Sequence, residues 1–149
     1  MSDWPEGQPR PVLVDTVVFS RAFVPEHRSE DGEDWFALLS GRTLVLAVQT
    51  EVELRAWPKL KHWGAPKTQR LLTSIDALGR IEVGPTVRDA FVNLTVWGNE
   101  DGHAIAQPIH VADRWIAASA MAWGLELATA DGIFDAIDGL ELLKLPEPS

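Results

Sequence analysis

The strongest indication of the fold is the stretch PIHVADRWIAASAMAWGLELAT at residues 108–129. It starts with proline and is apolar almost all round after Arg114, which predicts a central helix with little exposure to solvent. Gly124 suits the C-terminal end of that helix, and LELAT (125–129) has the composition of a short buried strand. A buried helix followed by a buried strand is typical of a sheet that helices cover on both faces.

The rest of the chain continues this alternation of strands and helices. Further strands are predicted at 12–15, 43–48, 80–83 and 140–145, and further helices at 29–40, 50–61, 66–78 and 85–97. Ser29 is a candidate N-cap, Pro58 is expected to disturb the helix that contains it, and NEDGH (99–103) is expected to form a polar loop. The sequence therefore predicts an α/β fold with a central parallel sheet of four to five strands.

Length and composition limit the class of protein. A chain of 149 residues with 46% hydrophobic content can bury one core, so we expect one domain at 12–149 after a flexible tail at 1–11. The absence of cysteine excludes disulfides, thiolate catalysis and cysteine-ligated metal sites, which leaves oxygen or imidazole ligands for any metal. No apolar run resembles a signal peptide or a membrane span, so we expect a cytoplasmic protein without membrane contact.

The formal net charge of −9 argues against nucleic-acid binding by overall electrostatic attraction, so any such contact must be local. One stretch without acids, between Glu53 and Asp76, is basic. It contains Arg55, Lys59, Lys61, Lys67 and Arg70, together with His62, Trp57 and Trp63. These residues are expected either to bind RNA, with the tryptophans stacking on bases, or to form a solvated helical face with buried tryptophans.

Four acids are expected at one edge of the sheet, because catalytic groups of open α/β sheets gather beyond the carboxyl ends of the strands. Asp15 ends the first strand, Glu53 lies in the first turns of the helix after the second strand, and Asp131 follows LELAT. Asp113 lies near the start of the apolar helix, where an ionised group is costly unless it is paired or coordinated. Their convergence predicts a divalent-metal site, whereas each acid alone has an alternative as a cap, turn residue or ion-pair partner.

Four strings resemble, in order and spacing, the acidic motifs of PIN-domain nucleases, and the similarity is closest to VapC-type toxins. They are LVDTVVFSRAF (13–23), QTEVELRAW (49–57), HVADRWIAASA (110–120) and LATADGIF (127–134). The acids of the four family motifs correspond, in chain order, to Asp15, Glu53, Asp113 and Asp131, and the hydroxyl before the last acid corresponds to Thr129. The resemblance spans about residues 12 to 145.

This resemblance implies a PIN-like three-layer fold and an endoribonuclease that depends on Mg²⁺ or Mn²⁺, ions that prefer oxygen ligands. Asp15, Glu53 and Asp113 would be primary ligands, Asp131 would bind or orient a second ion, and Thr129 would position water or phosphate. Cleavage would leave 5′-phosphate and 3′-hydroxyl ends. The resemblance also implies a toxin of a toxin-antitoxin pair, with RNA as substrate, a small VapB-like antitoxin as partner and a homodimeric assembly. It adds a third interpretation of the basic stretch, as a surface for dimer or antitoxin contact.

The sequence departs from the family pattern at two places. Val17 stands where the family often has Asn or Ser, and the segment 85–97 lacks the arginine-rich character of related proteins. These departures keep open a PIN-like domain that is catalytically weak or inactive and acts as a binding module. A phosphotransfer enzyme using Asp15 is a weaker alternative, because Val17 occupies the place of the second Asp that dehalogenase-like phosphatases require. His103 and His110 have no partner at ligand spacing, so we expect ordinary loop or helix-start residues.

Overall fold

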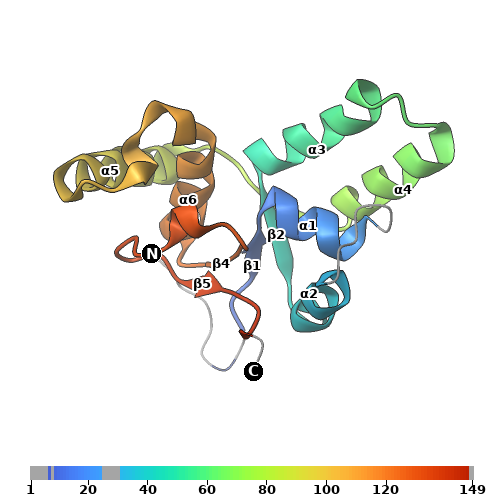
Figure 1. Ribbon diagram of the computed structural model, residues 1–149, viewed down its shortest axis with the longest axis horizontal. Helices are drawn as coiled ribbons and strands as arrows, with labels where there is room; N and C mark the ends of the chain where they lie inside the picture. The colour runs from blue at the N-terminus through green and yellow to red at the C-terminus, as the bar shows by residue number, and fades with distance from the viewer. Residues whose placement is uncertain (1–6, 8, 25–30, 148–149) are drawn as a thin grey trace.

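A computed structural model describes residues 7, 9–24 and 31–147 of the chain (Figure 1). Within these residues, parallel strands form one five-stranded sheet in the order β3-β2-β1-β4-β5. The strands are β1 (Val12–Val14), β2 (Leu44–Ala47), β3 (Gly79–Ile81), β4 (Glu126–Ala128) and β5 (Leu142–Leu143). The strand order changes direction beside β1, and ligand sites of such sheets form beyond the carboxyl ends of the strands at this switch point.

Helices cover both faces of the sheet (Figure 1). One face carries α1 (Thr16–Phe23), α2 (Gly32–Leu39), α3 (Val48–Leu60) and α4 (Ala65–Asp76), and the other carries α5 (Pro85–Asp101) and α6 (Val111–Trp123). Side chains of β1 alternate between the two layers, because Val12 and Val14 pack with α1 to α4 whereas Leu13 packs with α5 and α6. The three-layer α/β fold predicted from the sequence is confirmed.

The predicted buried helix is α6, which a short 3-10 helix, η3 (Pro108–His110), precedes. Every residue from Ile116 to Ala120 is buried, and Gly124 ends the helix in the left-handed region with a φ of 65°. In contrast, the prediction missed α1. The β-branched residues after Asp15 suggest a continued strand, but the Asp15 carboxylate accepts a hydrogen bond from the Val18 N–H at 2.8 Å and so caps a helix.

The predicted loop at 99–103 is wrong for its first part, because α5 continues to Asp101. Gly98 permits this extension. A Cβ atom on Gly98 would lie 2.9 Å from the Cβ of Ala106, so only glycine lets the 3-10 helix η2 (Ala104–Ala106) pack this closely against α5. Pro58 likewise does not interrupt α3, which continues to Leu60 with the proline buried.

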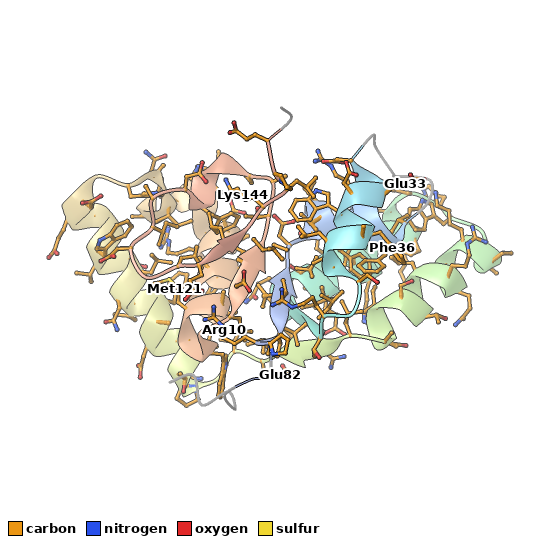
Figure 2. The ribbon with its side chains drawn as sticks, turned by 90° about the horizontal axis from the view of Figure 1, so that it is seen from below. Arg10, Glu33, Phe36, Glu82, Met121 and Lys144 are labelled. Carbon is orange, nitrogen blue, oxygen red and sulfur yellow. The ribbon has the colours of Figure 1, made fainter. Side chains whose placement is uncertain are left out.

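Some predictions fall at the borders of the described residues. The candidate N-cap Ser29 and most of the predicted tail lie outside them. Arg10, labelled in Figure 2, donates a hydrogen bond to the Gly124 carbonyl at 2.7 Å and pairs with Glu141, so this part of the tail segment is attached to the domain. Among the described residues, no helix combines the length and apolar character needed to cross a membrane.

Candidate functional site

The carboxyl ends of β1 and β4 bring two of the predicted acids together. Asp15 directly follows β1, and its backbone N–H donates to the Ala128 carbonyl at 3.1 Å. The Thr129 hydroxyl links the two acids, because it hydrogen-bonds to the Asp15 carboxylate and accepts from the Asp131 N–H at 3.0 Å. Asp131 in turn accepts from the Ile133 N–H at 3.0 Å and caps the 3-10 helix η4 (Gly132–Phe134). These contacts hold the backbone of Asp15 and Asp131 in place, so both side chains project from defined positions.

Helices α3 and α6 supply the other two predicted acids. Glu53, early in α3, accepts a hydrogen bond at 3.1 Å from the hydroxyl of Thr16, the residue next to Asp15. Asp113 lies in the first turn of α6, with its Oδ2 atom 3.2 Å from Nδ1 of His110. The negative charge of Asp113 also acts on Asp15. Thr129, Asp131 and Asp113 therefore act directly on Asp15, whereas Glu53 contacts the residue beside it.

The four acids differ in exposure. Asp15 is 5% exposed, the Asp113 side chain is 32% exposed, and Glu53 and Asp131 are exposed. Asp113 has the kind of partner that its position near the apolar helix was expected to require, because its carboxylate contacts His110 and is partly exposed to solvent. The costly position is that of Asp15, where β1 passes directly into α1.

Burial raises the pKa of Asp15 above its ordinary value, and the charges of Asp131 and Asp113 raise it further. Hydrogen bonds from Thr129 and from the Val18 N–H favour the ionised carboxylate and oppose this rise. The net direction is upward, because burial together with the two neighbouring charges outweighs the hydrogen bonds that favour the ionised carboxylate.

The raised pKa of Asp15 predicts that the metal-free protein loses stability as the pH rises. The folded state binds the proton more tightly than the unfolded state, so this stabilisation is complete below the ordinary pKa of an aspartate. It disappears as the pH rises through the folded-state value. Asp15→Asn cannot ionise, so its melting temperature in EDTA should fall less than that of the parent between about pH 4 and pH 8. Equal pH dependence in both proteins would contradict this prediction.

The donor set suits a hard divalent cation. Four carboxylates and one hydroxyl provide only oxygen, which Mg²⁺ and Mn²⁺ prefer. Within 7, 9–24 and 31–147, no three His, Asp or Glu side chains are already spaced to hold an ion. The raised pKa of Asp15 nevertheless supports the fit, because a cation would offset the repulsion among Asp15, Asp113 and Asp131.

Arg114 is the candidate ion-pair partner that the sequence offers to Asp113, but it hydrogen-bonds to other groups. Its guanidinium is buried beside Asp113 and donates to the carbonyls of Ile105 at 2.8 Å and Gln107 at 3.0 Å. It also donates to the hydroxyl of Thr95 on α5 at 3.2 Å. These bonds satisfy a charge that would otherwise be costly to bury, and they hold the start of α6 in place. Asp113 therefore projects from an anchored helix end.

The structure divides the basic residues that were predicted to bind RNA. Arg55 donates to Glu51 at 2.9 Å and to Asp76 at 2.6 Å, and Glu51 also pairs with Arg80 at 2.7 Å. Glu51 is 7% exposed, so these arginines neutralise a buried acid. Arg55 thus joins α3 to α4. The remaining members of the set lie nearer the connection between these helices or on α4: Lys59, Lys61, Lys67 and Arg70.

Comparisons with known proteins agree with this geometry. The model of the family described as PIN domain matches residues 12–140. The solved structure of FitAB bound to an IR36 DNA fragment has a TM-score of 0.72 and 25% identity, over 89% of this chain and 94% of that chain. FitAcB from Neisseria gonorrhoeae has a TM-score of 0.68 and 27% identity, over 88% of this chain and 95% of that chain. VapBC-5 from Mycobacterium tuberculosis, a member of the VapBC family of toxin-antitoxin systems, has a TM-score of 0.63 and 24% identity, over 91% and 99%. A search of the curated proteins finds no match.

Proposed function

Because the chain belongs to the PIN-domain family, we propose that it is an endoribonuclease dependent on Mg²⁺ or Mn²⁺ and the toxin of a toxin-antitoxin pair. Members of this family are generally nucleases that use divalent metal ions. The observation that carries the proposal is the position of Asp113 and Asp131 near Asp15, whose pKa is raised chiefly by burial and further by these two charges. Converging carboxylates destabilise a fold unless a cation or a function requires them.

In this proposal, Asp15, Glu53 and Asp113 hold one ion, and Asp131 binds or orients a second. A bound divalent ion supplies Lewis-acid chemistry at the phosphodiester bond. The protein positions the Asp15 carboxylate, because the Val18 N–H and the Thr129 hydroxyl both hydrogen-bond to it.

Thr129 and His110 have orienting roles in the same proposal. Thr129 is fully buried, and its hydroxyl accepts from the Asp131 N–H, so its proton is directed toward Asp15. It would therefore act on water or phosphate through the positions of these two acids. His110 limits the rotation of the Asp113 carboxylate through the contact at 3.2 Å. Products with 5′-phosphate and 3′-hydroxyl ends would follow if water attacks the phosphorus, the bond from phosphorus to the 3′-oxygen breaks, and that oxygen takes up a proton as it leaves.

We also propose a small antitoxin partner and a homodimer. The VapBC-5 structure comes from a family of toxin-antitoxin systems, which supports such a partner. The acids offer a second argument, because a site with four carboxylates attracts a cationic side chain that pairs with them and competes with metal. An arginine from an antitoxin segment has the required charge and geometry.

One observation favours the alternative of a binding module without nuclease activity. Val17 is 47% exposed beside Asp15, so the site offers an apolar contact where the family often has a side chain that forms hydrogen bonds. The phosphotransfer alternative has no comparable support, because the match to the PIN domain spans 12–140.

The toxin assignment predicts that expression of the chain alone arrests growth. Co-expression with the adjacent small gene should relieve the arrest and give a complex that co-purifies. Asp113→Asn, made at the same level, should be harmless, because growth arrest requires RNA cleavage. Colony counts after induction measure this. A soluble parent protein that is harmless refutes the toxin assignment, whereas equal toxicity of Asp113→Asn favours the binding module.

A further inference from the structure

The hairpin of α3 and α4 carries the basic stretch on the side of the molecule away from α5 (Figure 1). Five of the chain's 13 basic residues lie between Glu53 and Asp76, and none of its 22 acids does. The net charge of −9 means that the chain as a whole repels a polyanion. The hairpin is therefore a local exception that favours the approach of a polyanionic substrate.

Two lysines of the hairpin lie on tryptophan rings. The Lys61 Nζ atom is 4.4 Å from the centroid of the Trp57 ring, and the Lys67 Nζ atom is 3.9 Å from that of the Trp63 ring. Both indoles pack against the core, so the rings have fixed positions. Each ring thus covers the stem of a lysine and holds its ammonium group near the surface. A lysine thus lies over each of the two rings that were predicted to stack on bases.

The first of these pairs lies in line with the acidic site. Glu53 and Trp57 lie four residues apart on one stripe of α3, and Lys61, four residues further on, is the C-cap of that helix. With a rise of about 1.5 Å per residue, Lys61 lies about 12 Å from Glu53 along the helix axis. Exposed Lys59 lies near the same helix end. Arg55 is between these positions but is already paired with Glu51 and Asp76.

We propose that Lys59, Lys61 and Lys67 form a docking surface for the phosphates of single-stranded RNA, with Trp57 and Trp63 holding two of the lysines in place. This inference rests on the proposed nuclease function. RNA fits better than an acidic peptide, because the cations continue a line that starts at the acids, where a phosphodiester bond must lie for cleavage. Arg55 is excluded from the surface.

The test measures binding without cleavage. Fluorescence anisotropy of a labelled oligouridylate of about 12 nucleotides is recorded in EDTA at several KCl concentrations. For single strands, each phosphate contact adds about 0.7 to the steepness with which log K falls as log salt rises. Lys61→Met and Lys67→Met should therefore each make the slope less steep by about 0.7, and the double variant by about 1.4. Lys61→Arg, which keeps the charge, should retain the parent slope.

Arg88→Met is the matched control, because it removes one exposed positive charge from the first turn of α5, on the other side of the molecule. Its slope should equal that of the parent. The inference is overturned if the lysine variants keep the parent slope, if Arg88→Met changes the slope as much as they do, or if the parent does not bind the oligonucleotide. Lysine variants that bind RNA normally but no longer capture the antitoxin would assign the surface to the protein partner and also overturn it. Binding with the expected slope but no cleavage in Mn²⁺ would contradict the proposed function alone.

Discussion

Replacing Asp113 with asparagine is expected to lower the rate of RNA cleavage by more than about 100-fold, because loss of a group that only supports a metal ligand already costs about 10- to 100-fold. The amide removes the negative charge that a divalent cation requires but keeps the size of the side chain. Asp113 is partly exposed and contacts His110, so the fold should tolerate the change. The rate is measured with end-labelled RNA in excess Mn²⁺, and circular dichroism checks that the variant is folded.

The matched control for this variant is Asp89→Asn, which removes one exposed negative charge from α5. It should cleave RNA at the parent rate. Asp15→Asn should lose as much activity as Asp113→Asn, because both carboxylates act at one site. A folded Asp113→Asn protein with a rate within about tenfold of the parent would exclude Asp113 as a ligand.

Mn²⁺ is expected to stabilise the parent strongly and Asp113→Asn weakly. At an ion concentration 100 times the dissociation constant, binding to the folded state alone adds about 2.7 kcal/mol to the free energy of unfolding. For a chain of this size, that corresponds to a rise in melting temperature of about 5 to 10 °C. Melting curves with and without millimolar Mn²⁺ measure it.

The metal-free melting temperatures give an internal check on the same interpretation. Asp113 raises the pKa of Asp15 by charge repulsion, so removing its charge should leave the metal-free protein as stable as the parent or more stable. A variant that is equally stable in EDTA but gains little from Mn²⁺ has lost a ligand. The same metal-induced shift in both proteins would count against Asp113 as a ligand.

The fold could largely be predicted because its signals are local. The apolar composition of α6 and the short apolar strands indicate burial directly, and alternation of strands with helices implies a parallel sheet. Two features depend on contacts that the local pattern does not contain. The β-branched start of α1 favours a strand until Asp15 caps it, and the close packing of η2 on α5 depends on Gly98, which meets Ala106.

The sequence predicts which residues lie near one another in the site, but not which of them is buried. The ends of parallel strands meet at one edge, so Asp15 and Asp131 were expected to be neighbours. Which acid is buried depends on three-dimensional packing, and the structure assigns that position to Asp15 rather than Asp113. The pairing of Arg55 with Asp76 also joins separate helices, so spacing alone suggested a role in RNA binding.

The most direct test of the central claim, that these carboxylates hold a catalytic metal ion, is cleavage of single-stranded RNA by the purified parent protein. With Mg²⁺ or Mn²⁺ present, the account predicts internal cleavage to fragments with 5′-phosphate and 3′-hydroxyl ends. Excess EDTA should abolish this activity, and excess Mn²⁺ added afterwards should restore it. Equal cleavage in EDTA, or no cleavage with either ion, would contradict the account.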